Sequence, residues 1–262
     1  MQTEKVVDHI VKWLKDYATQ AQMKGFIIGV SGGIDSAVTS TLCARTGLDL
    51  LCVEMPIHQG SDQVSRADEH LEWLQQNYPN VKRQPVHLTS VFDQLVAALP
   101  KVDNEEERFM SLANTRARLR MTTLYYFAAL QKYLVAGTGN KVEDFGIGFY
   151  TKYGDGGVDL SPIADLLKTE VYALGSYLGV PESIQQAAPT DGLWGDQRTD
   201  EDQIGASYPE LEWAMCMQEQ GKSIQDFSGR EKEVFLIFTS LNSANKHKMV
   251  PIPVCEIPAA MK

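Results

Sequence analysis

The sequence predicts an α/β fold, a doubly wound parallel sheet with helices on both faces. Short apolar runs of strand length alternate with longer segments of helical periodicity, which is the pattern of successive βα units. A glycine-rich turn joins the first apolar run to the helix that follows it. The 262 residues, 44% of them hydrophobic, are enough for a sizeable core, and no repeat or linker divides them. We therefore expect a single domain over residues 1–262.

Apolar patterning places the elements along the chain. Period and length predict strands at residues 26–30, 50–55, 82–88 and 133–138. The same criteria predict helices at residues 6–17, 37–46, 61–78, 90–99, 105–132, 167–178, 207–220 and 228–243. The first of these helices is amphipathic. Two segments rich in glycine and aspartate, 139–165 and 187–205, are predicted as loops, and the tail 249–262, with three prolines, as extended chain.

Charge and cysteine usage exclude several classes of protein. The formal net charge of −10 argues against non-specific nucleic-acid binding, which needs lysine and arginine to neutralise phosphates. The four cysteines form no CxxC pair and no zinc spacing, which indicates idle thiols in a reducing compartment. Residues 1–20 are polar, and no run of about 18 apolar residues follows. We expect a cytoplasmic protein without nucleic-acid or membrane partners.

The most informative local pattern is Ser-Gly-Gly-Ile-Asp-Ser at residues 31–36, between a predicted strand and a predicted helix. Two glycines let the backbone approach an anion closely, and the following helix presents free N–H groups and the positive end of its dipole. Ser31 and Ser36 add hydroxyl groups. Asp35 fits beside a polyanion only if a divalent cation lies between them, and its alternative role is that of a helix cap. The pattern predicts a phosphate-binding loop.

This loop is not the Walker-type P-loop, which has four residues between its glycines and a lysine after the second. The string SGGIDS resembles the signature of the N-type ATP pyrophosphatases, whose fold is adenine nucleotide alpha-hydrolase-like. Members of this superfamily cleave ATP between its α and β phosphates. The resemblance implies that Asp35 binds Mg²⁺ and that ATP is bound by Gly29, Val30, Ser31, Gly32, Gly33, Ile34, Asp35 and Ser36.

A second cluster points to one family within that superfamily. Residues 137–168 read GTGNKVEDFGIGFYTKYGDGGVDLSPIADLLK and resemble ammonia-dependent NAD synthetase, most clearly over TKYGDGG. The resemblance implies that Thr138 and Lys168 contact ATP and that Glu143 is a second Mg²⁺ ligand. It also implies that Lys152 and Asp159 contact the substrate deamido-NAD. Asn140 stands where the family varies between His and Asn, so whether a side chain transfers a proton there stays open.

Three further stretches match the same family. Arg118, within residues 114–121, stands where an arginine binds deamido-NAD, whereas Arg116 and Arg120 cannot share its helix face. His247 and Lys248 match a pair that closes on deamido-NAD. Thr190 matches a threonine that contacts ATP, and residues 192–194 after it resemble a mobile loop. Residues 57–110 match poorly and yield no site residue.

The resemblance implies ATP-dependent amidation of deamido-NAD with ammonia, which gives NAD, AMP and pyrophosphate through an acyl-adenylate. Asp35 and Lys168 would stabilise charge on the α-phosphate together with Mg²⁺. Asp159 is a candidate base that deprotonates ammonium. The family forms homodimers, and here the first helix and the Arg118 helix are the expected contacts. Relatives that use glutamine carry an extra amidohydrolase domain, so free ammonia is the simplest nitrogen source, with a separate glutaminase as the alternative.

Two other classes of protein would share the phosphate loop. A tRNA-modifying pyrophosphatase should show paired reactive cysteines or a basic face for RNA, and neither is present in the sequence. A non-catalytic nucleotide-binding module should lack Asp35, Glu143 or Lys168, and all three are present. ATP turnover with deamido-NAD discriminates all three hypotheses.

Overall fold

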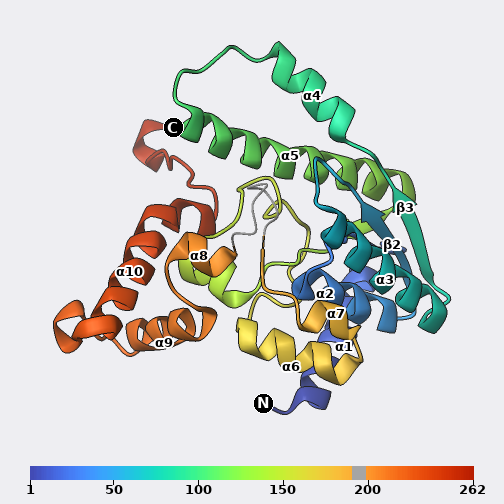
Figure 1. The fold of residues 1–262 in the computed structure, drawn as a ribbon, viewed down its shortest axis with the longest axis horizontal. Coiled ribbons are helices and arrows are strands. Elements are labelled where there is room, and N and C mark those ends of the chain that lie inside the picture. Colours follow the sequence, from blue (N-terminus) through green and yellow to red (C-terminus); the bar gives the residue numbers. More distant parts are fainter. Residues whose placement is uncertain (191–198) are drawn as a thin grey trace.

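The computed structural model describes residues 1–190 and 199–262 and is built on a four-stranded parallel sheet (Figure 1). The strands, in the spatial order β3-β2-β1-β4, are β1 (Gly25–Gly29), β2 (Asp49–Glu54), β3 (Val81–Pro85) and β4 (Tyr133–Val135). Gly25 pairs with Asp49 of β2 on one side and with Tyr133 of β4 on the other. Each of the four strands overlaps the segment predicted for it.

Helices cover both faces of the sheet, which confirms the predicted doubly wound fold. One face packs in a large apolar core against α1 (Thr3–Gln20), α2 (Ile34–Arg45), α3 (Ser61–Asn77), α6 (Lys168–Leu178) and α7 (Glu182–Gln185). The other face packs against α4 (Thr89–Ala98) and α5 (Glu105–Gln131). The central strand β1 is therefore buried on both sides, which explains its continuous apolar sequence.

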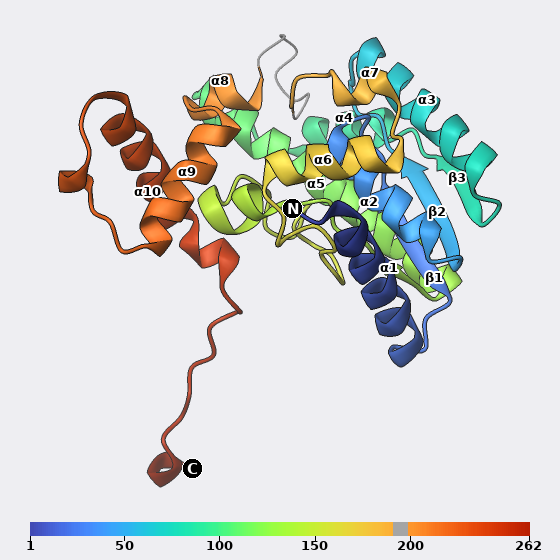
Figure 2. The ribbon, with the colours of Figure 1, turned by 90° about the horizontal axis from the view of Figure 1, so that it is seen from below.

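A third apolar core lies beside the sheet and is formed by later parts of the chain (Figure 1). It comprises the π-helix η1 (Val142–Ile147), α8 (Asp200–Ile204), α9 (Tyr208–Glu219), the 3₁₀ turn η2 (Ile224–Asp226) and α10 (Gly229–Met249). The tail after α10 is extended and ends in a 3₁₀ turn, η3 (Ala259–Met261), away from the body in Figure 2. The single domain over residues 1–262 stays a prediction.

The structure differs from the sequence prediction in both segments predicted as loops. Residues 142–147 form η1 because the side chain of Asn140 accepts hydrogen bonds from the first free N–H groups, those of Val142 and Glu143. Asp200–Ile204 forms α8, which Thr199 caps through the backbone N–H of Asp202. Both helices are too short for a hydrophobic period to be visible in the sequence.

The strand order fixes where a site can form. The chain runs outward from β1 to β2 and β3, and then returns to place β4 on the other side of β1. The carboxyl ends of β1 and β4 therefore meet at a topological switch point, where ligands bind in open α/β sheets. Residues 30–36 follow β1 and residues 136–141 follow β4, so the two sequence motifs converge there. In the described part of the chain, no helix has the length and apolar character needed to cross a membrane.

A buried histidine links α2 to α3 behind this edge. The Nε2 atom of His70 lies 2.8 Å from the Ser40 hydroxyl, and its ring stacks on Trp73 with centroids 5.7 Å apart. His70 has no exposed surface, and its Nδ1 atom has no hydrogen-bond partner among the described residues. Burial lowers the pKa of His70 to about 4, so the ring is neutral at physiological pH.

His70 should make the folded state sensitive to acid. The unfolded side chain takes up a proton below pH 6.5, whereas the folded one does so only near pH 4, so acid favours unfolding across this interval. We expect this residue to contribute about 2 kcal/mol less to the free energy of unfolding at pH 5 than at pH 7. Urea denaturation at both pH values should show that His70→Gln loses less free energy of unfolding between pH 7 and pH 5 than the wild type does.

His9→Gln is the matched control, because His9 is exposed on α1. It should keep the wild-type difference between the two pH values. An equal acid sensitivity in wild type and His70→Gln would contradict the prediction.

Candidate active site

The loop after β1 closes on itself through its two serines. The hydroxyl groups of Ser31 and Ser36 lie 3.1 Å apart, and the Ser36 hydroxyl also donates to the Gly33 carbonyl at 3.0 Å. α2 begins at Ile34 directly after this turn, so its free N–H groups face the loop. The predicted phosphate-binding loop therefore has the geometry of an anion site at a helix N-terminus.

Gly32 has a conformational reason to be glycine. Its φ is +81°, and an added Cβ would approach the Gln63 carbonyl oxygen of α3 to 2.5 Å. Arg66, one turn further along α3, donates from Nε to the Gly32 carbonyl at 3.4 Å. Sequence reasoning missed Arg66 because residues 57–110 carry no recognisable motif. It brings a cation to the edge of the loop.

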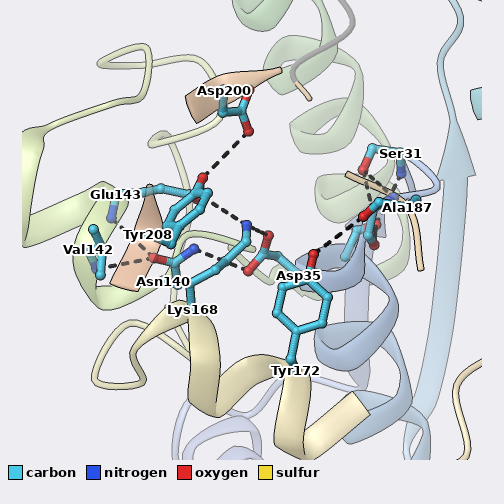
Figure 3. A network of polar contacts seen from close by, with 12 residues as sticks. Ser31, Asp35, Asn140, Val142, Glu143, Lys168, Tyr172, Ala187, Asp200 and Tyr208 are labelled. Atoms are coloured by element: carbon cyan, nitrogen blue, oxygen red, sulfur yellow. Dashed lines mark hydrogen bonds and ion pairs between the residues drawn. The ribbon is translucent and has the colours of Figure 1, made fainter. Parts of the chain in front are cut away.

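The centre of the site is a buried set of charges from three elements (Figure 3). The Nζ atom of Lys168, at the start of α6, lies 2.5 Å from Asp35 Oδ2 on α2 and 2.9 Å from Glu143 Oε1 on η1. The Lys168 side chain is only 3% exposed, and the two carboxylates are 17% and 15% exposed. Three residues that are far apart in the sequence, and that were predicted for the nucleotide and its metal, thus meet at one point.

Electrostatics keep Lys168 charged in this environment. Burial alone lowers the pKa of Lys168, but the charges of Asp35 and Glu143 outweigh it, so the pKa is raised and the amine stays an ammonium. For Asp35, burial raises the pKa while Lys168 lowers it, and the net direction is upward. The set has one cation for two carboxylates, and so it has capacity for further positive charge.

Two residues without a predicted role complete the set. Asn140 is buried and donates from Nδ2 to Asp35 Oδ1 at 3.2 Å, while its own oxygen caps η1. Tyr208, at the start of α9, donates its hydroxyl to Glu143 Oε1 at 2.5 Å, and the Lys168 ammonium lies 4.7 Å from its ring centroid. Asn140 follows a recognised glycine motif, but no sequence signal links Tyr208 to Glu143, which lies 65 residues earlier.

A second cluster holds four residues predicted for the dinucleotide substrate. The guanidinium of Arg118, on α5, donates to the Lys152 carbonyl at 3.3 Å, and Lys152 Nζ donates to the His247 carbonyl at 2.8 Å. Lys248 donates from Nζ to the carbonyls of Gly148 and Tyr150 at 2.5 and 2.8 Å. The structure therefore brings Arg118, Lys152, His247 and Lys248 together from α5, the loop after η1 and the end of α10.

The two arginines that flank Arg118 on α5 point elsewhere, in accordance with helical geometry. Arg116 lies over the ring of Phe92 at 4.8 Å. Arg120 is half-buried and donates to the Met55 carbonyl at 3.0 Å, and desolvation lowers its pKa to about 10. Both arginines hold α5 against neighbouring elements, which leaves Arg118 as the exposed arginine of the group.

A cavity of about 140 Å³ lies beside the second cluster. Gly137 and Gly139, from the segment after β4, line it on the side of the nucleotide site, and Lys248 lines it on the side of the second cluster. Asp144, Asp155 and Tyr150 complete the wall together with apolar side chains. Burial raises the pKa of Asp144 to about 7. A ligand in this cavity would touch Lys248 of the second cluster and the two glycines that flank Thr138.

Thr138, Asp159 and Thr190 are not among the residues that line this cavity. Thr138 is half-buried between the two lining glycines. Asp159 accepts hydrogen bonds from the Tyr125 hydroxyl at 3.0 Å and from the Val135 backbone at 2.8 Å, and so ties β4 to α5. Thr190 is exposed at the end of the described segment, and residues 192–194, predicted as a mobile loop, lie outside the described residues.

The donor set suits a hard divalent cation that arrives with phosphate. Mg²⁺ in proteins is commonly held by one or two carboxylates together with substrate phosphates and water. Asp35 and Glu143 supply two carboxylates, and within residues 1–190 and 199–262 the Oε2 atom of Glu143 has no hydrogen-bond partner. The described residues contain no group of three or more metal-ligating side chains, so the protein alone offers an incomplete coordination shell.

Fold and site together define a class of protein, the nucleotide-using enzymes that bind their ligand at the switch point of a doubly wound sheet. Within this class the chain belongs to the NAD synthase family, whose profile matches residues 6–251. It is 40% identical over 228 residues to the NH₃-dependent NAD(+) synthetase of Carboxydothermus hydrogenoformans, covering 87% of this chain and 91% of that protein. The predicted family, an ATP-using ligase of NAD biosynthesis, is thereby confirmed.

Solved structures agree with this assignment. An NMN synthetase from Francisella tularensis superposes with a TM-score of 0.82 at 30% identity, and the match covers 99% of both chains. An NH₃-dependent NAD synthetase from Campylobacter jejuni, in complex with nitrate, superposes with a TM-score of 0.78 at 25% identity, covering 98% of this chain and all of that one. The predicted α/β fold is thus that of the family.

Removal of the shared cation should destabilise the site strongly. Lys168→Met leaves Asp35 and Glu143 buried without a counter-charge, and breaking a buried pair in this way costs about 3–5 kcal/mol. We expect this loss in urea denaturation without nucleotide, and a partial recovery when Asp35→Asn is added.

Lys12→Met provides the control, because Lys12 also lies 2.5 Å from an aspartate, Asp16, but its side chain is 74% exposed. It should cost less than about 1 kcal/mol. Equal losses of unfolding free energy for Lys168→Met and Lys12→Met would show that Lys168 contributes no more than the lysine of an exposed ion pair.

Proposed function

We propose that this chain catalyses the ATP-dependent amidation of deamido-NAD by ammonia, forming NAD, AMP and pyrophosphate. The observation that carries the proposal is the buried Asp35–Lys168–Glu143 set at the phosphate loop. The cavity lined by Gly137, Gly139 and Lys248 joins the segment after β4 to the Arg118–Lys152–Lys248 cluster. Family membership and the printed names of the relatives support the same reaction.

In the first step the nicotinate carboxylate attacks the α-phosphorus of ATP. A carboxylate–phosphate bond forms, pyrophosphate leaves, and negative charge increases on the α-phosphoryl oxygens. The loop of residues 31–36 holds the phosphates through its backbone N–H groups, and the Lys168 ammonium stabilises the developing charge. A protein nucleophile is not required, because the substrate supplies the attacking oxygen.

Mg²⁺, held by Asp35 and Glu143, would neutralise the phosphates and polarise the reacting phosphoryl group. The carboxylates are already held in place by Lys168, Asn140 and Tyr208. This preorganisation lowers the cost of assembling the site when the nucleotide binds.

In the second step ammonia attacks the acyl carbon, AMP leaves, and the nitrogen loses a proton as the amide forms. Ammonium must be deprotonated before it can attack. Asp159 stays the predicted base, although both of its oxygens already accept hydrogen bonds in the structure. Free ammonia is the proposed nitrogen source, in line with the relatives named NH₃-dependent.

A second candidate reaction uses the same chemistry on a smaller acid. The likeness to an NMN synthetase, with a TM-score of 0.82 over 99% of the chain, favours amidation of nicotinate mononucleotide. The two substrates share the nicotinate ring and its ribose phosphate and differ in the adenylate half, so their relative kcat/KM decides between them.

The proposed reaction is tested with purified protein, ATP, Mg²⁺, ammonium chloride and either acid. We expect deamido-NAD to give NAD and AMP in equal amounts, with a kcat/KM above that for nicotinate mononucleotide. Asp35→Ala should lose at least about a hundredfold of this activity, because a ligand of the charge-stabilising set is removed. Asp16→Ala, an exposed aspartate of α1, is the control and should retain it.

A higher kcat/KM for nicotinate mononucleotide would assign the second candidate reaction. Failure to release AMP with either acid would overturn both. Equal activity of Asp35→Ala and wild type would remove Asp35 from the mechanism.

We also propose that the chain acts in the cytoplasm as a homodimer, as the family resemblance implies. Apolar side chains remain exposed on both helices expected at the contact, Trp13 and Tyr17 on α1 and Tyr126 and Leu130 on α5. Exposed aromatic and aliphatic side chains are typical of surfaces that are buried on association.

Light scattering should give twice the 29.1 kDa mass of one chain. Leu130→Glu should shift the mass toward that of the monomer, because Leu130 is 62% exposed on α5. Leu236→Glu, at a 45% exposed position of α10, is the matched control and should stay dimeric. A monomeric wild type would contradict the proposal.

A further inference from the structure

Tyr208 is the member of the buried set whose role neither the sequence nor the family match assigns. It is 3% exposed, and its hydroxyl lies 2.5 Å from Glu143 Oε1 and 3.5 Å from Asp200 Oδ2. The contact with Glu143 is the shorter, and so the stronger, of the two hydrogen bonds. The phenol has one proton to donate, and both contacts are with carboxylate oxygens, which accept.

The two oxygens of Glu143 are unequal because of this contact. Oε1 accepts from both Tyr208 and Lys168, at 2.5 and 2.9 Å. Oε2 has no partner among the described residues, as noted above. Donors on one oxygen of a ligating carboxylate fix its orientation and leave the other oxygen available to a metal.

Tyr208 is itself rigidly held. Its backbone N–H donates to Glu201 Oε1 at 2.8 Å, and the preceding Ser207 is capped by Glu210 at 2.8 Å. Arg230 of α10 then donates twice to Glu210, each time at 2.8 Å. The hydroxyl is therefore positioned by α8, α9 and α10, which belong to the third core, whereas Asp35 and Lys168 belong to helices that cover the sheet.

We propose that Tyr208 is a positioning residue for the metal in the proposed reaction, in which its hydroxyl orients Glu143 so that Oε2 is available to the nucleotide-bound cation. Its ring, against Lys168, restrains the ammonium at the same time. The inference rests on the proposed role of Glu143 as a metal ligand, but not on which acid is amidated.

The test uses Mn²⁺ as a spectroscopic probe with α,β-methylene-ATP and no acid substrate. Free Mn²⁺, followed by electron paramagnetic resonance, reports its binding to the protein–nucleotide complex. Tyr208→Phe keeps the ring and loses the donor, and should weaken Mn²⁺ binding by about tenfold or more. Tyr133→Phe removes a comparable tyrosine–carboxylate bond, to Asp49 at 2.9 Å, outside the site, and should change binding less than about twofold.

Two unnatural side chains separate the hydrogen bond from packing. 4-Fluorophenylalanine at position 208 fills the space of the hydroxyl but donates no hydrogen bond, so it should weaken Mn²⁺ binding as Tyr208→Phe does. It serves as the donor-free variant if Tyr208→Phe fails to fold. 4-Aminophenylalanine restores a donor and should recover wild-type binding. In a Glu143→Ala background, Tyr208→Phe should have no further effect, because the group it orients is gone.

Unchanged Mn²⁺ binding in the two donor-free variants would overturn the proposal, including when their melting temperature falls, since Tyr208 would then be a core residue only. If wild type binds no Mn²⁺ with the analogue, the metal role of Glu143 fails and the proposal with it. A donor effect on Mn²⁺ binding without any NAD formation would uphold Tyr208 and overturn only the proposed reaction.

Discussion

The interaction on which the site depends is the buried ammonium of Lys168 between Asp35 and Glu143. Charges taken out of water are costly unless they are paired and hydrogen-bonded, so this set constrains its surroundings. Asn140 and Tyr208 supply the further donors that the two carboxylates need. Because α2, α6, η1 and α9 each contribute one member, the charges lock together elements that belong to different apolar cores.

The sheet topology determines that these elements can meet at all. The order β3-β2-β1-β4 sets the ends of β1 and β4 side by side, so that the phosphate loop faces the segment after β4. The substrate cluster lies next to it, because α10 returns to the loop after η1 and Lys248 donates to Gly148 and Tyr150. The cavity beside Lys248 is thus built from the edge of the sheet and from the third core.

Local sequence predicted well those parts that local physics governs. A strand covered on both faces is a continuous apolar run, as in β1, and an amphipathic helix shows its period, as in α1. Short elements were missed because their caps stabilise them. Asn140 caps η1 and Thr199 caps α8. Both elements are too short for a hydrophobic period to be visible in the sequence. The predicted roles of individual site residues rest on resemblance and stay predictions.

The sequence by itself determined the fold class, the phosphate loop and the family, because these reside in contiguous residues whose backbone and side-chain chemistry acts locally. The tertiary structure alone decided which charges pair. Lys168 lies 133 residues from Asp35, and Tyr208 lies 65 residues from Glu143, so no spacing in the chain encodes their contacts. The contacts of Lys168 with Asp35 and of Tyr208 with Glu143 become favourable when packing excludes water from these side chains. In water, exposed ions gain little from one another.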